Sequence, residues 1–440
     1  MEKEKKGLNI SAKSFITAIA VIFVLMVLTY GLTFVVPGGS IPFWKWILSP
    51  VLVLGADGNV SLIAVIVFLL VIGGVFNCLD KCGLMKYMLD KITSQFGKER
   101  YKLLAIVTLF FMLMGSFIGS FEECVPMVPI VVALAIRLGW DALVGVGMSL
   151  LAIGCGFAAG VCNPFTVGVA QELAGLPMFS GMWFRMVGFV LVYVLLLGFL
   201  THYAKRIEKP LDEEVGAATF VRKMKMDKGL VCFVSVMVAG ILLVLSSVFI
   251  KALQDYTMII VAVTFLVAGI TSALLSGMGG NLMKTFWNGL VSVLPAVLMI
   301  LMANSIKFTL EEGNILNPIL QSAISVAQTL PRWTVILFIY LIVLVMNFFI
   351  ASGSAKAFLL MPLIVPVAEV FGISAQLCVM AYAFGDGFSN VFYPTNPVLL
   401  ISLGLADVDY AKWAKWSFKF QGLNILLTSG LLLLGLVIGY

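Results

Sequence analysis

Residues 392–400 read FYPTNPVLL and interrupt an otherwise apolar stretch of the chain. Pro394 and Pro397 each lack the amide hydrogen that an α-helix needs, and each ring clashes with the carbonyl one turn earlier. A continuous helix therefore cannot pass through this stretch. The sequence on either side must explain why such an apolar chain breaks its backbone here.

The composition places this break inside a membrane protein. The chain has 440 residues, of which 61% are hydrophobic and 11% are charged, and its mean hydropathy is +1.10. A soluble domain carries about a quarter charged residues. Apolar runs of about 20 residues, long enough to span a bilayer, recur from end to end. We therefore expect an all-α polytopic membrane protein, whose net charge of +6 reflects topology and not nucleic-acid binding.

The apolar runs give a topology. Two of them, 103–137 and 333–371, are interrupted at the middle by small and charged residues, and we expect them to be re-entrant helical hairpins. Lys and Arg gather on the loops that this layout places inside, which puts the N-terminus in the cytoplasm and the C-terminus outside. The membrane is expected to be the bacterial inner membrane. The candidate full spans are 14–37, 59–77, 142–175, 184–203, 229–250, 258–276, 285–306, 375–405 and 413–438.

The most polar segment, 204–228, is predicted to be a cytoplasmic linker between two halves. It separates a first repeat, 1–203, from an extra span at 229–250 and a second repeat at 251–440. Within the first repeat, 78–102 has apolar residues at helical spacing with basic residues between them. This pattern predicts an amphipathic helix at the inner membrane surface.

The two halves resemble each other. When the chain is shifted by 233 residues, the window 129–164 aligns with 362–397. Because of the extra span, the second copy runs inverted, and inverted repeats with broken helices are typical of secondary transporters. Unwound backbone at membrane depth is tolerated only where it is buried or lines a cavity, which explains both FYPTNPVLL and its counterpart CNPFT (162–166). The aligned pairs are Pro129/Pro362, Val132/Val365, Ala135/Ala368, Gly139/Gly372, Ala142/Ala375, Val146/Val379, Gly154/Gly387, Asn163/Asn396 and Pro164/Pro397.

Polar residues gather at the two hairpin tips and at the two helix breaks. An ionisable group at membrane depth costs at least ~2.5–3.5 kcal/mol, so we expect the charged ones to bind substrate or to pair with one another. The candidate substrate-binding residues are Ser120, Glu122, Glu123, Asn163, Thr166, Ser352, Gly353, Ser354, Lys356, Asp386, Asn390, Thr395 and Asn396. The candidate sodium site is near Gly119, Ser120, Asn163, Ser354 and Asn396.

The charges suggest how a substrate would lie. Glu122 or Glu123 is expected to bind an amino group or a coupling cation, and Lys356 the substrate carboxylate. A Glu–Lys ion pair across the two tips is the structural alternative. With a single histidine, no P-loop and no H-E-x-x-H motif, the sequence does not favour an enzyme, and a channel does not require duplicated helix breaks.

Four stretches carry a family resemblance. They are GSFEECVPMVPIVVALAIRLGWD, GFAAGVCNPFTVGVAQELAG, SGSAKAFLLMPLIVPVAEVFG and FGDGFSNVFYPTNPVLLISLG, and they resemble the YfcC-type branch of the anaerobic C4-dicarboxylate carriers, in the ion transporter superfamily. The resemblance implies a homodimer in which a transport domain with hairpins and broken helices moves like an elevator against a scaffold. Sodium-coupled dicarboxylate relatives carry Ser-Asn-Thr at each tip, whereas this chain has Gly-Ser-Phe-Glu-Glu and Ser-Gly-Ser-Ala-Lys.

These observations predict a secondary active transporter of a small carboxylate-bearing metabolite. The charges and the branch favour an amino acid such as arginine or ornithine, carried by exchange or by cation symport with Na⁺ or H⁺. Transport of a C4-dicarboxylate or a short-chain carboxylate is the alternative. No other cofactor is expected.

Overall fold

The computed structural model describes residues 12–36, 39–56, 60–85, 87–88, 91, 99–119, 121–177, 179–210, 220–247, 257–327 and 329–440. The described residues form helices and connections and contain no strand, so the all-α prediction is confirmed. The helices are α1 (Ala12–Val35), α2 (Phe43–Ile47), α3 (Ser49–Leu52), α4 (Val60–Lys81), α6 (Arg100–Leu113), α7 (Val128–Arg137), α8 (Ala142–Val146), α9 (Ala152–Ala158), α10 (Val169–Leu173), α11 (Met182–Ile207), α12 (Phe220–Ser247), α14 (Thr257–Leu275), α15 (Leu282–Ser292), α16 (Leu294–Glu312), α17 (Leu316–Ala327), α18 (Arg332–Phe349), α19 (Gly353–Val370), α20 (Ala375–Asn390), α21 (Pro397–Leu405) and α22 (Tyr410–Ile438).

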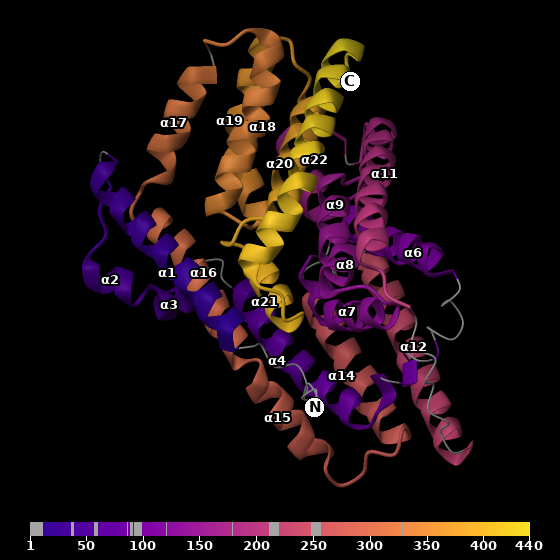
Figure 1. The fold of residues 1–440 in the computed structure, drawn as a ribbon. Coiled ribbons are helices and arrows are strands. Elements are labelled where there is room, and N and C mark those ends of the chain that lie inside the picture. The colour runs from indigo at the N-terminus through magenta and orange to yellow at the C-terminus, as the bar shows by residue number, and fades with distance from the viewer. Residues whose placement is uncertain are drawn as a thin grey trace.

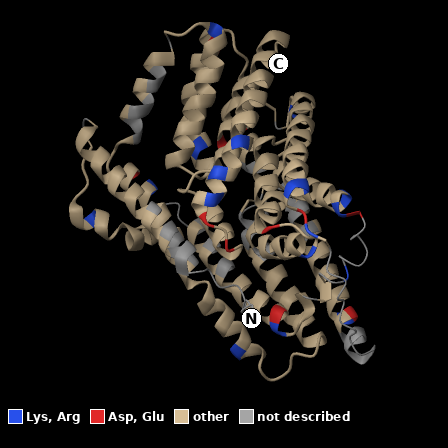
Figure 2. Ribbon diagram, viewed as in Figure 1, with Lys and Arg blue, Asp and Glu red and all other residues tan. Residues whose placement is uncertain are grey.

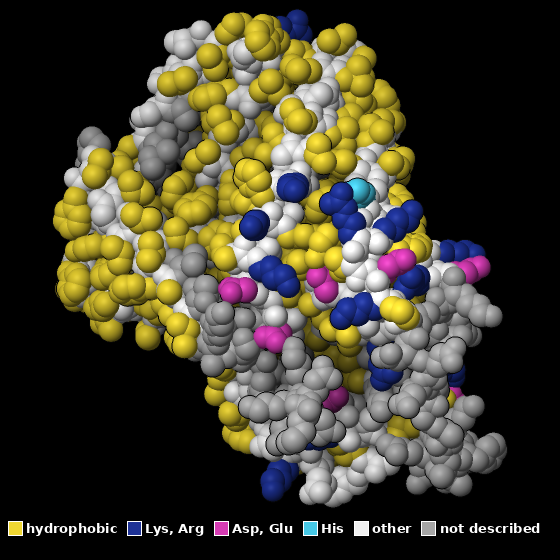
Figure 3. Space-filling view, viewed as in Figure 1, with side chains coloured by type: hydrophobic (Ala, Val, Ile, Leu, Met, Phe, Trp, Pro, Cys, Tyr) yellow, Lys and Arg dark blue, Asp and Glu magenta, His cyan; other side chains and the backbone are white. Residues whose placement is uncertain are grey.

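The surface of the protein is that of a membrane protein. Figure 2 shows long ribbon stretches without charge, and in Figure 3 apolar side chains cover the upper and left parts of the face while most charged ones gather at its middle and right. Large apolar residues such as Leu426 and Val437 are 72% and 83% exposed, as expected for lipid-facing positions. In the described part of the chain, five helical stretches are long and apolar enough to cross a bilayer: Arg100–Phe117, Met182–Ile207, Arg332–Phe349, Gly353–Val370 and Tyr410–Ile438.

The helices form two neighbouring groups in Figure 1. Long helices α1, α4, α15 and α16 run diagonally, with α12 and α14 at their lower end, and α6–α11 and α18–α22 pack beside them. Glycines allow the first group to pack closely, because a Cβ on Gly289 would lie 2.2 Å from the Gly73 carbonyl oxygen and one on Gly269 2.1 Å from Val75. Small residues at such crossings let membrane helices approach each other.

Both predicted helix interruptions are present. Helix α9 ends at Ala158, and a π-helical turn at Pro164–Gly168 precedes α10. Helix α20 ends at Asn390, and α21 begins at Pro397. We call 159–163 the first break and 391–396 the second break.

The two broken helices cross at glycines that the 233-residue shift relates. A Cβ on Gly154 would lie 2.3 Å from Val391, and one on Gly387 would lie 2.3 Å from the Ala158 nitrogen. The shift that takes Gly154 to Gly387 also takes Ala158 to Val391. The two contacts are therefore equivalent under the sequence alignment.

The chain before each broken helix repeats the same turn. Gly139 and Gly372, which the shift also relates, adopt φ values of +84° and +66°, a region that favours glycine. Two residues later, Asp141 caps α8 by accepting from Val144 N, and Ser374 caps α20 by accepting from Leu377 N. Side-chain oxygens in these positions satisfy amides that the first helical turn leaves free.

Each interrupted segment has its two ends close together. Arg100, at the start of α6, donates to the Leu138 carbonyl oxygen after α7 at 3.2 Å. Arg332, at the start of α18, donates to the Gly372 carbonyl oxygen after α19 at 2.9 Å. Each arginine therefore joins the entry and the exit of its segment. We call 115–124 the first tip and 350–358 the second tip.

Three boundaries differ from the sequence predictions. The expected span 285–306 is divided at Val293, because Pro295 favours the first turn of a new helix, α16. The expected linker 204–228 is partly helical, since α11 continues to Ile207 and α12 begins at Phe220 with helix-forming Lys and Met residues. In the expected amphipathic helix 78–102, α4 continues to Lys81 and α6 begins at Arg100, and 86, 89–90 and 92–98 lie outside the described residues.

Candidate functional site

Lys356 and Asp386 form a buried ion pair between the second tip and α20. Both side chains are 0% exposed, and Lys356 Nζ lies 2.5 Å from Asp386 Oδ1. The ammonium also donates to the Ile350 carbonyl oxygen at 3.2 Å and to Asn347 Oδ1. An ammonium has three donors, so these three oxygens engage all of them.

Asn347 connects this pair to the second break. Its amide nitrogen lies within hydrogen-bonding distance of the Asp386 carbonyl oxygen (3.1 Å), Ser389 Oγ (2.7 Å) and Asn390 Oδ1 (3.0 Å). Asn396 Nδ2 donates to the same Asn390 oxygen at 3.0 Å. Sequence reasoning missed Asn347, although a single carboxamide near the end of the apolar helix α18 was the available signal.

The asparagine of each break accepts a hydrogen bond from a backbone amide that follows the break. Asn396 Oδ1 accepts from Val398 N at 2.9 Å and caps α21. Asn163 Oδ1 accepts from Thr166 N at 3.2 Å. Each carboxamide thus satisfies an amide that the break leaves without a helical partner. Asn163 and Asn396, which the 233-residue shift aligns, therefore share one structural role.

The first tip lies on the first break. Ser116 Oγ donates to the Ala159 carbonyl oxygen at 3.1 Å and accepts from Val161 N at 3.0 Å. Gly119 has φ +75°, and a Cβ there would lie 2.1 Å from Asn163 Oδ1. Only glycine fits this approach between the tip and the asparagine.

The second tip touches both halves of the protein. A Cβ on Gly353 would lie 2.7 Å from Asp386 Oδ2 and 2.7 Å from the Thr166 methyl carbon. Tyr382 of α20 donates to the Gly353 carbonyl oxygen. Gly353 therefore places the Lys356–Asp386 pair beside Thr166, in the π-helical turn that follows the first break.

Three buried polar atoms in this region have no hydrogen-bond partner within the described part of the chain: Asp386 Oδ2, Thr166 Oγ1 and Thr395 Oγ1. Buried polar groups are nearly always paired, so each exception needs an explanation. Asp386 Oδ2 and Thr166 both lie against Gly353. A polar ligand at this junction would find one free acceptor and hydroxyls that can donate or accept.

The remaining predicted site residues are placed as follows. Ser352 accepts from Ala355 N at 3.5 Å and caps α19, and Ser354 is half-buried. Glu122 and Glu123 lie in a 3₁₀ turn, Glu122–Met127, but their side chains, like the whole of Ser120, lie outside the described residues. Of the expected sodium ligands, Gly119 and Asn163 are in contact, while Asn396 belongs to the network around Asn390.

Arg185 is a buried cation that sequence reasoning missed. Its side chain, at the start of α11, is 2% exposed. The guanidinium donates to the Val161 carbonyl oxygen of the first break at 3.2 Å, and to Ser180 O, Gln376 Oε1 and Tyr440 Oη at 2.8, 3.4 and 3.2 Å. Arg185 thus holds the first break against α20 and the end of α22.

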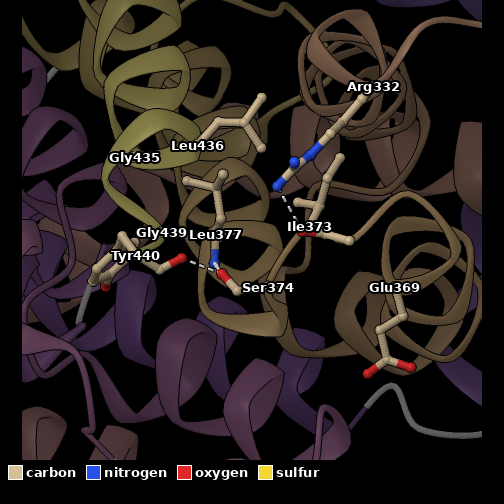
Figure 4. A pocket seen from close by; sticks show the side chains of 10 residues that line it. Arg332, Glu369, Ile373, Ser374, Leu377, Gly435, Leu436, Gly439 and Tyr440 are labelled. Carbon is tan, nitrogen blue, oxygen red and sulfur yellow. Dashed lines mark hydrogen bonds between the residues drawn. The ribbon is translucent and has the colours of Figure 1, made fainter.

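A separate cavity of about 220 Å³ lies at the far end of the second hairpin. Figure 4 shows Arg332 and Glu369 on two sides of it, with Arg332 bonded to the backbone and Ser374 bonded to Tyr440. None of its lining residues belongs to the Lys356–Asp386 network. The cavity is therefore distinct from the candidate site.

A family model matches most of the chain. The model of the DcuC family, described as C4-dicarboxylate anaerobic carrier, matches residues 48–437. The chain is 33% identical over 403 residues to the "Putative basic amino acid antiporter YfcC" of Escherichia coli K12, covering 86% of this chain and 78% of that protein. It is 25% identical over 398 residues to an uncharacterized protein of Haemophilus influenzae, covering 86% and 76%. The solved structure of the Alcanivorax borkumensis YdaH transporter aligns with a TM-score of 0.48 at 18% identity, over 96% of this chain and 99% of that one.

Proposed function

Since the chain belongs to the C4-dicarboxylate anaerobic carrier family of membrane transporters, we propose that it is a secondary active transporter of an amino acid such as arginine or ornithine. The family makes it a multi-pass transporter of a small molecule and not an enzyme. Exchange of one amino acid for another is the proposed mode, with symport of H⁺ or Na⁺ as the alternative coupling. A relative of 33% identity carries a basic amino acid antiporter in its name, which supports this substrate class.

The observation that carries the proposal is the unpartnered oxygen of Asp386. Asp386 Oδ2 is buried beside Gly353 and Thr166 and accepts no hydrogen bond from the described residues. A buried carboxylate oxygen is stabilised strongly by a charged donor. A substrate amino or guanidinium group would supply that donor.

The cations of the site argue against a dianion as substrate. All three donors of Lys356 are engaged by protein oxygens, and Arg185 is bonded to four protein oxygens. A second substrate carboxylate would have to displace one of these partners. The C4-dicarboxylate alternative is supported by the family description and requires such a displacement.

The single carboxylate of an amino acid can bind without Lys356. Thr395 Oγ1 is buried without a partner in the described structure, and it precedes the N-terminus of α21. Half-helix N-termini at the breaks of transporters favour anionic groups. In this arrangement Asp386 binds the cationic end of the substrate and Thr395 the anionic end.

We further propose that the two interrupted segments are re-entrant and move with the two broken helices as the transport domain of a homodimeric elevator. The bonds of Arg100 and Arg332 support this, because each joins the two ends of its segment. The contacts of Gly119 and Gly353 support it too, because each tip packs on a broken helix. The N-terminus is proposed to be cytoplasmic.

Cysteines placed at Lys102 and Arg137 should react from the same side of the membrane. Both residues are exposed, and they lie at the two ends of the first interrupted segment. The measurement uses a membrane-impermeant maleimide on right-side-out and inside-out vesicles, in a background without the seven native cysteines. Labelling of the two positions from opposite sides would make this segment a pair of full spans.

The substrate proposal is tested by exchange in proteoliposomes. Vesicles loaded with arginine should take up labelled arginine or ornithine much faster than empty vesicles, because exchange needs a substrate on both sides. Vesicles loaded with succinate should behave like empty ones, with or without gradients of Na⁺ or pH. Fast uptake of labelled succinate into succinate-loaded vesicles, with no amino acid exchange, would establish the dicarboxylate alternative instead.

A further inference from the structure

The Lys356 ammonium lies in a cage of oxygen atoms. Its three acceptors are a carboxylate oxygen of Asp386, the carboxamide oxygen of Asn347 and the backbone oxygen of Ile350. Asp386 Oδ2 adds an unused oxygen on the same carboxylate. Hard metal cations bind to carboxylate, carboxamide and backbone oxygens of this kind, so the donor set suits a small cation as well as an ammonium.

The cage lies at the carboxyl end of a helix. Ile350 is the C-cap of α18, which ends at Phe349 in the middle of the hairpin. The carbonyl end of a helix carries partial negative charge, and half-helix C-termini coordinate Na⁺ or H⁺ in broken-helix transporters. The cage therefore combines a full negative charge with a helix end that attracts cations.

The position of Lys356 in its own helix is unfavourable for a cation. It is in the first turn of α19, which begins at Gly353, and a cation is unfavourable at a helix N-terminus. Its side chain instead lies at the end of α18, at the Ile350 carbonyl, and beside Asp386. The residue that the 233-residue shift places at this position in the first half is Glu123, so of these two aligned positions only the one at the second tip carries a cation.

We propose that Lys356 is a tethered cation at the second tip and occupies a site whose oxygen ligands suit a sodium ion. A tethered cation is never released, so this site cannot draw on a sodium gradient. The consequence for transport rests on the proposed function. Because the Lys356 ammonium stays in the cage throughout transport, the carrier exchanges substrates without binding sodium at this site. The occupancy of the cage itself does not depend on which substrate is carried.

The test is to empty the cage and offer sodium to it. Lys356→Ala removes the ammonium and its chain and leaves the oxygens of Asp386, Asn347 and Ile350. The purified full-length variant should unfold at a temperature that rises with NaCl relative to choline chloride of equal ionic strength, because a ligand that binds only the folded state stabilises it. The wild-type protein should show a smaller sodium-specific rise or none.

Two control variants define the site. Lys356→Met fills the volume with an apolar chain, so it should not respond to sodium as the alanine variant does. Lys356→Ala/Asp386→Asn keeps the space but removes the negative charge, and it should also lose most of the response. Both controls differ from the test variant at the cage alone.

Equal sodium responses in the wild-type protein and Lys356→Ala, including no response in either, would overturn the proposal. If Lys356→Ala can be purified only in the presence of sodium, that result supports it. Failure of both Lys356→Ala and Lys356→Ser to fold in any salt overturns the proposal. If the cage binds sodium, sodium would enter the emptied cage and stabilise the folded state of these variants. The melting experiment contains no substrate, so a failure of amino acid exchange in proteoliposomes leaves its result intact.

Discussion

Lys356→Met should destabilise the protein by about 3–5 kcal/mol, because removing one member of a buried ion pair leaves the other charge without compensation. Asp386 is 0% exposed, and Lys356 is its ion-pair partner in the described structure. Methionine fills much of the lysine volume, so the loss measures charge and hydrogen bonding more than packing. A loss of this size is a large share of a typical net stability. Denaturant unfolding in detergent micelles measures it, and transport should be abolished as well.

The paired control is Lys356→Met/Asp386→Asn. Replacing both members of a buried pair is often close to neutral, and Asn at position 386 can turn its amide to donate to the Asn347 oxygen that Lys356 leaves. The double variant should therefore recover more than half of the lost stability but not transport, since the free carboxylate oxygen is gone. A double variant no more stable than Lys356→Met would show that the two side chains do not act as a pair.

Gly387→Val should prevent the broken helices from crossing and remove both stability and transport. The first carbon of any side chain at Gly387 would lie 2.3 Å from the Ala158 nitrogen and 2.4 Å from the Ala158 Cα. These are backbone atoms of α9, so no rotamer change relieves the contact and the helices must separate. Overpacking costs about 1–3 kcal/mol when side chains can adjust, and here we expect at least that much. The yield of monodisperse protein and its melting temperature measure the effect.

Gly198→Ala is the matched control on a membrane helix. A Cβ on Gly198 of α11 would meet nothing within 4 Å, and alanine favours a helix by about 1 kcal/mol over glycine. This variant should melt at the wild-type temperature or slightly above it and should transport normally. If Gly387→Val also folded and transported like the wild-type protein, the close crossing of α9 and α20 would be wrong.

The sequence predicted those features that depend on local chemistry. Proline removes a helical hydrogen bond, and Pro164, Pro394 and Pro397 marked both breaks because each stands next to asparagine or threonine. Proline by itself does not end a helix in this protein, since Pro362 and Pro366 lie inside α19. The same reasoning failed at 285–306, where the apolar run hides the division before Pro295.

The partners of the buried polar residues could not be predicted. Sequence reasoning assigned Lys356 to the substrate carboxylate, with an ion pair to Glu122 or Glu123 as the structural alternative, whereas in the structure the ammonium bonds to Asp386 and Asn347. Which carboxylate a lysine reaches depends on the crossing of α19 and α20, and no spacing in the sequence encodes that crossing. Arg185 was missed for the same reason, because its acceptors come from four separate places in the chain.

The crossing of α9 and α20 bears on how such a protein can evolve. Gly154 meets Val391 and Gly387 meets Ala158, which is the reciprocal pattern of an interface between two identical copies. In a dimer of half-length chains, any mutation at such a contact would occur on both sides at once. In one continuous chain the two contacts can mutate independently, and here Val391 faces Gly154 while Ala158 faces Gly387. The same freedom allows Lys356 and Glu123 to occupy aligned positions, so this single chain holds opposite charges where two identical subunits would have to carry the same one.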